Sequence, residues 1–149
     1  MPEHPLEILL VEDNPSDVMI ARRALSRGLV QHRLSVVRDG QEALDYLFRR
    51  DAFSDAARAP TPDLILLDLN LPRVDGFEVL RTIKGDFHLR RIPVIMLTTS
   101  ERDEDVINSY QLGANTFISK PVEFNRFLNI IRVLHEYWGQ VARLPSISR

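Results

Sequence analysis

Short apolar runs that turn polar at their C-terminal ends recur along this chain, and segments with helical spacing separate them. A run at 33–40, RLSVVRDG, is shorter and half polar, as expected of an edge strand. The other runs are LEILLVED (6–13), DLILLDL (63–69), IPVIMLTTS (92–100) and NTFISKP (115–121). This alternation of strand and helix predicts an α/β fold, a parallel sheet with helices on both faces and right-handed crossovers.

The segments between these runs carry apolar residues at the spacing of an amphipathic helix. Asn14 or Ser16 can cap the first segment, and the acid-rich stretch SERDED before the fourth suits the positive end of a helix. The polar, proline-bounded stretch 49–62 is expected to form an extended loop before the third strand. The apolar stripes are Val18, Ala21, Ala24 and Leu25; Ala43, Leu44, Leu47 and Phe48; Phe77, Val79, Leu80 and Ile83; Val106, Ile107, Tyr110 and Leu112; and Phe124, Phe127, Leu128, Ile131 and Leu134.

Composition limits the classes of protein to which the chain can belong. A net charge of -2 gives no indication of binding to nucleic acid or an anionic membrane. The absence of cysteine excludes disulfides, thiolate metal sites and cysteine nucleophiles. No apolar stretch is long enough to span a membrane, and acids flank the short apolar core of the N-terminus. We therefore expect no signal peptide and a cytoplasmic location.

The length of 149 residues suits one domain with a sizeable core. We expect a single domain over residues 1–149, with the core at about 6–138. Residues 139–149 would form a C-terminal tail, which is too short for an output domain.

The polar residues that end the expected strands should meet, because the carboxyl ends of parallel strands lie along one edge of a sheet. The first strand ends in Glu12 and Asp13, the third in Asp68, the fourth in Thr98 and the fifth in Lys120. Two carboxylates about 4 Å apart repel by about 4 kcal/mol at an effective dielectric constant near 20. A divalent cation would relieve this repulsion, and Mg²⁺ suits a site with few carboxylates and open positions.

A magnesium ion, an ammonium group and a hydroxyl group around one carboxylate suit phosphoryl chemistry. Magnesium and Lys120 would offset charge on the phosphoryl oxygens, and Thr98 would donate a hydrogen bond to one of them. Asp68 stands alone on its strand, whereas Glu12 and Asp13 are adjacent. Asp68 is therefore the candidate nucleophile, which would form an acyl phosphate.

Each of these residues also has a structural interpretation. Asp68 could be a turn residue, and Glu12 with Asp13 could cap the helix that follows. Thr98 could be an ordinary strand residue, because threonine has a high β-propensity. Lys120 could be solvated, but only two of the 19 basic residues are lysines, which favours a point contact with phosphate at this position. The convergence of all five on one edge favours the functional interpretation.

Four stretches of the sequence resemble the signatures of the receiver domain of two-component response regulators. They are LLVEDN, LILLDLNLPRVDG, IMLTTS and GANTFISKP, in the order of that family. The resemblance implies a flavodoxin-like (βα)5 fold, a doubly wound five-stranded parallel sheet with strand order 2-1-3-4-5. It also implies a phospho-accepting signalling protein and not an enzyme, with slow autodephosphorylation at most.

The resemblance implies a donor and a cofactor for this site. Asp68 would accept a phosphoryl group from a sensor histidine kinase. Glu12, Asp13, Asp68 and the backbone carbonyl of Asn70 would hold Mg²⁺, for which Mn²⁺ or Ca²⁺ could substitute.

The same resemblance implies a switch. Thr98 would contact the phosphoryl group and shift on phosphorylation, and Lys120, which precedes Pro121, would pair with the group. Phe117 stands where the family keeps an aromatic residue that turns inward as the threonine moves, although an aromatic residue on a strand is usually part of the core. The phosphoryl group would bias an existing two-state equilibrium.

A narrower resemblance links the chain to the stand-alone regulators that partner bacterial and cyanobacterial phytochromes. It rests on the long loop before the third strand and on the stretches LTTSERDEDVINSYQLGAN and YWGQVARLP. It implies a phytochrome-type kinase as partner and a homodimer through the C-terminal helix and the region of the fifth strand. That helix has apolar residues beyond one core stripe, which suits either a partner subunit or one broad stripe under the tail. The candidate dimer residues are Ile130, Val133, Tyr137, Trp138 and Val141.

Three other functions fit the sequence less well. A magnesium-dependent phosphatase with an aspartyl nucleophile usually has a second acid two residues later, where this chain has Asn70. A nucleotide- or flavin-binding module would need a glycine-rich phosphate loop, and neither a P-loop nor a GxGxxG motif occurs. A DNA-binding protein is the weakest alternative, because no helix-turn-helix remains once the sheet is counted. We therefore expect no nucleic-acid and no membrane partner.

Overall fold

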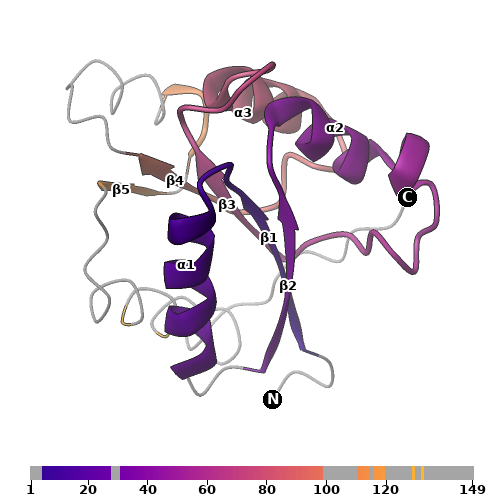
Figure 1. Ribbon diagram of the computed structural model, residues 1–149. Helices are drawn as coiled ribbons and strands as arrows, with labels where there is room; N and C mark the ends of the chain where they lie inside the picture. Colours follow the sequence, from indigo (N-terminus) through magenta and orange to yellow (C-terminus); the bar gives the residue numbers. More distant parts are fainter. Residues whose placement is uncertain are drawn as a thin grey trace.

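The computed structural model describes residues 5–27, 31–98, 111–114, 116–119, 129 and 132. Strands and helices alternate through most of this range, as the sequence predicts (Figure 1). The elements are β1 (Leu6–Val11), α1 (Pro15–Arg27), β2 (His32–Val37), α2 (Gly40–Phe48), the 3-10 helix η1 (Asp51–Phe53), β3 (Leu64–Asp68), α3 (Gly76–Gly85), β4 (Val94–Thr98) and β5 (Thr116–Ser119). The helices expected after residues 105 and 121 lie almost entirely outside the described residues, among which 111, 129 and 132 are helical.

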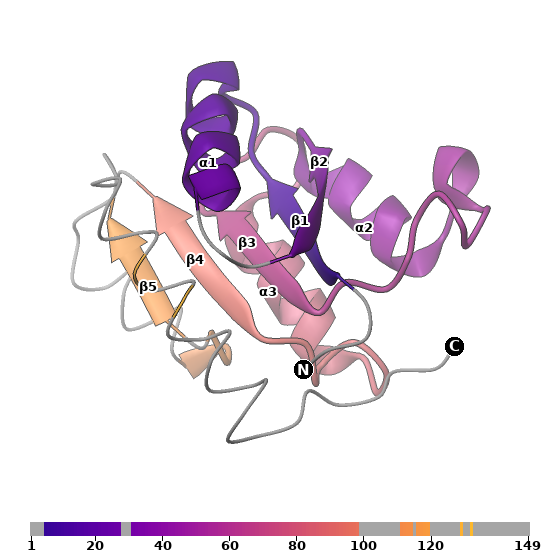
Figure 2. The same cartoon turned by 90° about the horizontal axis from the view of Figure 1, so that it is seen from below.

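The five strands form one parallel sheet in the order β2-β1-β3-β4-β5, which confirms the fold class and the strand order. Figure 2 shows the arrows of β1, β3, β4 and β5 pointing the same way. β2 lies at one edge, as its half-polar sequence predicts. β3 lies at the centre, and all five of its residues are buried. A carboxylate at the end of β3 is therefore held on the most rigid part of the sheet.

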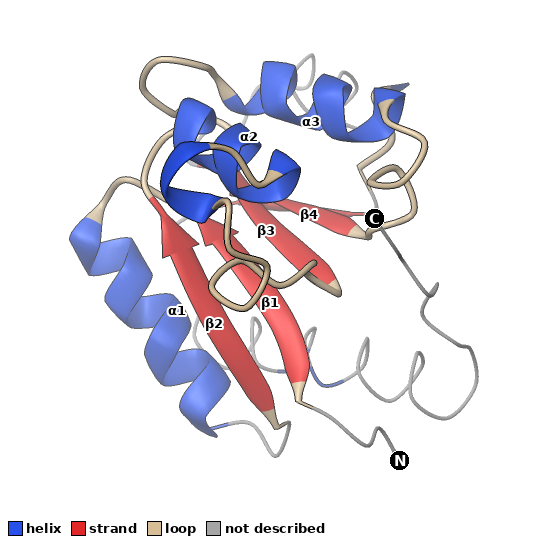
Figure 3. Ribbon diagram, turned by 90° about the vertical axis from the view of Figure 1, so that its right-hand side faces the viewer, coloured by secondary structure: helices blue, strands red, loops and turns tan. Residues whose placement is uncertain are grey.

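Helices cover both faces of the sheet, with α1 on one face and α2 and α3 on the other (Figures 1 and 3). Successive side chains of a strand point to opposite faces, so each buried strand contributes to two cores. On β3, Leu64 and Leu66 pack with α1, whereas Ile65 and Leu67 pack with α2 and α3. Full burial of each such side chain contributes about 1.5–3 kcal/mol. The unbroken apolar run of β3 is therefore explained by helices on both sides.

The three described α-helices begin at polar caps. Asn14 caps α1, and its Oδ1 accepts hydrogen bonds from the backbone N–H of Ser16 at 2.8 Å and of Asp17 at 3.3 Å. This result selects Asn14 over Ser16 as the cap of the first helix. Pro15 occupies the first helical position, where its missing N–H costs no hydrogen bond.

Helices α2 and α3 begin with the same sequence pattern, Asp-Gly-x-Glu. Asp39 Oδ1 accepts from the N–H of Glu42 at 2.7 Å, and Asp75 Oδ1 accepts from the N–H of Glu78 at 2.9 Å. The glycine after each aspartate is buried and begins the helix. Both helices therefore combine an acidic N-cap with a first residue that has no side chain.

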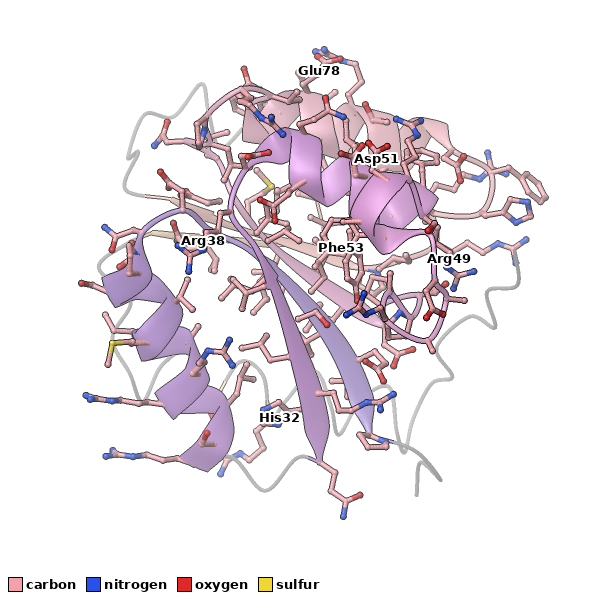
Figure 4. All side chains as sticks on the ribbon, turned by 45° about the vertical axis from the view of Figure 1, so that its right-hand side comes forward. His32, Arg38, Arg49, Asp51, Phe53 and Glu78 are labelled. Carbon is pink, nitrogen blue, oxygen red and sulfur yellow. The ribbon has the colours of Figure 1, made fainter. Side chains whose placement is uncertain are left out.

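The stretch 49–62 connects α2 to β3 as a long loop, as the sequence predicts, but it also contains a short helix and specific contacts. It contains η1, and Arg49 leaves α2 in the left-handed conformation, with φ at 55°. Arg49 then donates from Nε to the carbonyl of Ala59 at 3.2 Å and from a terminal nitrogen to Thr61 Oγ1 at 3.2 Å. Phe53 packs edge-on against the ring of Tyr46 at 5.3 Å between centroids. Figure 4 shows the Arg49 and Phe53 side chains at the end of α2. Specific side-chain contacts therefore fold this stretch onto the domain.

Lys84, one of the two lysines, has a structural role at the far end of α3. Its Nζ donates to the carbonyls of Ile92 at 2.9 Å and Arg90 at 3.1 Å, which ties α3 to the segment before β4. Burial of the ammonium lowers the pKa of Lys84 below its ordinary value.

No helix among the described residues is long and apolar enough to cross a membrane.

Gly76 should tolerate no side chain, because a β carbon there would lie 2.4 Å from the carbonyl oxygen of Asp68. We expect Gly76→Ala to lower the free energy of unfolding by about 1–3 kcal/mol, the usual cost of overpacking. The measurement is urea unfolding followed by far-UV circular dichroism.

The matched control is Gly85→Ala at the last residue of the same helix, where a β carbon would meet no neighbouring atom within 4 Å. This change should leave stability unchanged or raise it by up to about 1 kcal/mol. Equal unfolding midpoints for the two alanine variants would contradict the close approach at Gly76.

Candidate functional site

The register of the sheet brings three acidic residues to one edge. β1 and β3 are neighbours and pair Val11 with Leu67, so the residues that follow them leave the sheet at the same level. Glu12 and Asp13 follow Val11, and Asp68 follows Leu67. The backbone remains ordered there, because Glu12 N–H donates to Val37 O at 3.0 Å. The C-terminal edge of the sheet therefore carries an acidic site, as the sequence predicts.

The carboxylates of Glu12, Asp13 and Asp68 lie close enough to share one ion. One oxygen from each lies within 4.8 Å of an oxygen from each of the others. Glu12 is only 2% exposed and Asp68 only 4%, whereas Asp13 is exposed. The site thus has two donors on the protein side and one donor toward solvent.

Backbone N–H groups partly offset the buried charge. Asn14 N–H donates to Glu12 Oε2 at 3.3 Å, and Asn70 N–H donates to Asp68 Oδ1 at 3.3 Å. These bonds are long, and each carboxylate has two oxygens that can accept several hydrogen bonds. A hard divalent cation that prefers oxygen ligands fits this donor set, and Mg²⁺ and Mn²⁺ both accept few carboxylates with water in the remaining positions.

Asn70 is placed by the two leucines on either side of it. Leu69 is 5% exposed and Leu71 is 9% exposed, and both belong to the core that packs α2 and α3 against the sheet. Asn70 between them is exposed. The segment directly after Asp68 is therefore anchored on both sides of the residue whose backbone carbonyl is the predicted fourth metal ligand.

The predicted residues on β4 and β5 are placed only through their backbones. Thr98 is the last residue of β4, one position beyond Leu97, which pairs with Asp68. Phe117 lies on β5 opposite Met96. Lys120 and the candidate dimer residues lie outside the described residues. The structure therefore brings together Glu12, Asp13 and Asp68, and the roles of the others stay predictions.

Sequence reasoning missed the residues that support the loop between β3 and α3. Asp39 and Gly40 at the start of α2 contact this loop, and Arg73 within it pairs with Asp39. The signal was present as the repeated pattern DGQE at 39–42 and DGFE at 75–78. A local pattern indicates two similar helix starts, but it does not indicate that both contact one loop.

Comparison with known proteins agrees with this geometry. The family model for the response regulator receiver domain matches residues 8–132. The response regulator Rcp1 of Synechocystis sp. is 38% identical over 142 residues, which cover 95% of this chain and 95% of Rcp1. The match therefore extends along almost the full length of both proteins.

Solved structures give the same result. The phosphorylated cyanobacterial phytochrome response regulator RcpA is 43% identical, with a TM-score of 0.82 over 96% of this chain and 100% of RcpA. The Mn²⁺-bound form of Rcp1 is 38% identical, with a TM-score of 0.81 over 95% of this chain and 100% of Rcp1. The bacteriophytochrome response regulator AtBRR is 48% identical, with a TM-score of 0.75 over 91% of this chain and 96% of AtBRR. With this fold, this acidic edge and these relatives, the chain belongs to the response regulator receiver domain family.

Proposed function

We propose that this protein is a stand-alone response regulator in which Asp68 accepts a phosphoryl group from a sensor histidine kinase. The observation that carries the proposal is the acidic cluster, in which the buried Asp68 carboxylate lies within 4.8 Å of the Glu12 and Asp13 oxygens. Asp68 ends the central strand, so its position is fixed before any donor arrives. Pre-positioned groups lower the entropic cost of a reaction between two molecules.

The reaction transfers phosphorus from nitrogen to oxygen. A carboxylate oxygen of Asp68 attacks the phosphorus of a phosphohistidine, a P–O bond forms as the P–N bond breaks, and the imidazole nitrogen leaves with the electron pair. A bound Mg²⁺ would neutralise charge on the phosphoryl oxygens. Glu12 and Asp13 would supply further carboxylate oxygens close to Asp68, which would favour cation binding there.

Lys120 and Thr98 complete the proposed site. Lys120 comes directly after Ser119 in the sequence, and Ser119 pairs with Thr98 at the end of β4. A lysine ammonium suits a point contact with a phosphoryl oxygen, and a threonine hydroxyl can donate to another. The Phe117 side chain would then turn inward as Thr98 moves, which would change the surface of the domain.

Single-domain organisation and a phytochrome-type kinase extend the proposal. Rcp1, RcpA and AtBRR match this chain over nearly their whole lengths, and RcpA and AtBRR are phytochrome response regulators. We place the protein in the cytoplasm, with a bacteriophytochrome-type histidine kinase as donor and protein contacts as output. A phosphatase remains disfavoured, because Asn70 cannot protonate a leaving group.

Phosphorylation of Asp68 is tested with acetyl phosphate. We expect a magnesium-dependent shifted band on a phosphate-affinity gel for the wild type and no band for Asp68→Asn, because an amide is a poor nucleophile. Asp55→Asn is the matched control, since Asp55 is an exposed loop residue that caps the N–H of Ala57 and an asparagine can do the same. A band in Asp68→Asn, or its loss in Asp55→Asn, would contradict the assignment.

The metal site is tested by neutralising its exposed carboxylate. Asp13→Asn should stabilise the metal-free protein by up to about 1 kcal/mol, because it removes repulsion that water partly screens. The same change should reduce the rise in melting temperature that Mg²⁺ produces. Differential scanning calorimetry with and without Mg²⁺ measures both effects, and a metal-free protein destabilised by the change would show that Asp13 is not crowded by like charge.

The dimer is tested on the C-terminal helix. A charge at a buried interface is costly, so Val133→Glu should convert a dimer into a monomer of 17.2 kDa. Asn129→Asp is the control, because Asn129 is an exposed, helical residue that is not among the candidate dimer residues. Sizing chromatography with light scattering gives the mass, and a wild type that elutes as a monomer at all concentrations would contradict the dimer.

A further inference from the structure

We propose that the start of α2 holds the loop between β3 and α3, and that Asp39, Gly40 and Arg73 are positioning residues for metal binding and phosphorylation at Asp68. This inference rests on the function proposed above and adds residues that lie outside the acidic cluster. The loop, residues 69–75, begins directly after Asp68 and carries Asn70.

The loop is closed at its base by α3. Gly76 N–H donates to Leu69 O at 2.9 Å, which joins the two ends of the loop. A β carbon on Gly76 would also lie 2.9 Å from that same carbonyl oxygen. This contact joins the two ends of the loop, and Leu71 is held in the core, so the outer part, residues 72–74, must be held by other contacts.

The start of α2 holds the outer part. Gly40 N–H donates to Pro72 O at 3.4 Å, so the loop supplies an acceptor to a first-turn N–H that has no partner within the helix. A β carbon on Gly40 would lie 1.8 Å from Val74 O, a separation that no side chain allows. The loop backbone therefore rests directly on the helix backbone, and α2 and α3 lie side by side on this face (Figure 3).

An ion pair joins the same two segments. A terminal nitrogen of Arg73 donates to Asp39 Oδ1 at 3.1 Å, and this oxygen also accepts the capping hydrogen bond from Glu42 N–H. Arg73 is in the left-handed conformation, with φ at 67°, which is unfavourable for an arginine. The chain thus has an arginine in an unfavourable backbone conformation at a loop position that reaches the cap of α2, and the exposed pair contributes only modestly to stability.

These contacts between α2 and the loop should affect metal binding, because the loop carries Asn70. Asn70 is held by Leu69 and Leu71, and the next residue, Pro72, is held by Gly40. A displacement of the loop at Gly40 would move the Asn70 carbonyl and the N–H that donates to Asp68 Oδ1. Groups that support metal ligands typically change metal affinity by about 10- to 100-fold when they are altered.

The test compares loop contacts with matched changes elsewhere. Gly40→Ala should weaken Mn²⁺ binding, measured by electron paramagnetic resonance, by about tenfold. Gly85→Ala, which adds the same atoms where space is free, should leave the affinity within about twofold. Urea unfolding of both variants shows that folded protein is compared, and a folded Gly40→Ala variant with wild-type Mn²⁺ affinity would overturn the proposal.

The ion pair is tested by variants that keep the backbone. Asp39→Asn retains a capping oxygen, and Arg73→Gln retains most of the stem; each should lower Mn²⁺ affinity about two- to threefold. The double variant should lose no more than either single one, because the two side chains act as a pair. Arg73→Lys should restore most of the affinity, and Arg81→Gln is the control, since it removes an exposed pair with Glu78 on α3.

The readouts separate this inference from the function on which it rests. Mn²⁺ affinity tests the support of the loop even if acetyl phosphate modifies none of the variants, a result that would count against the proposed function alone. Where the wild type is phosphorylated, the initial rate for Gly40→Ala at saturating metal should also fall about tenfold. Additive losses in the double variant, or equal losses in Arg81→Gln, would show a general effect on stability and would overturn the positioning role.

Discussion

The pairing of β1 with β3, which brings the carboxylates of Glu12, Asp13 and Asp68 together, is the constraint on which the rest of the site depends. Two of the three groups are almost fully buried, and all three lie within 4.8 Å of one another. β1 and β3 are paired and packed on both faces, so the buried Glu12 and Asp68 that follow them stay close together. The packing of the central strands therefore keeps two buried carboxylates near one another at the carboxyl edge of the sheet, an arrangement that suits a divalent cation.

The sequence predicts this arrangement because its causes are local or periodic. The apolar run from Leu64 to Leu67 can be buried on both faces only at the centre of a parallel sheet, and the alternation of strands and helices sets the parallel direction. The C-terminal residues of parallel strands lie at one edge of the sheet. The direction of the strands alone therefore predicts that Asp68 lies near Glu12. The strand order itself came from the resemblance and agrees with the structure.

Contacts between distant segments are what the sequence does not predict. Asp39 and Arg73 are 34 residues apart, and nothing in either neighbourhood indicates that they meet. The fold of the stretch 49–62 depends on Arg49, which donates to one carbonyl and one hydroxyl group of the same stretch, and such geometry has no periodic signature. The rarity of lysine indicated a specific role for Lys120, but Lys84 shows that a rare lysine can also be structural, because it binds two backbone carbonyls.

The two Asp-Gly-x-Glu helix starts both place a glycine against the loop after Asp68. A loop that is proposed to carry a metal ligand must lie close to the strand that it leaves and keep a fixed position, because a small displacement of a ligand weakens the site. Gly76 permits the close approach at one end of the loop, and Gly40 permits it at the other. A side chain at either position would open a gap between helix and loop. The glycines are therefore required by the rigidity of the loop after Asp68, whereas the aspartates before them satisfy the helix starts.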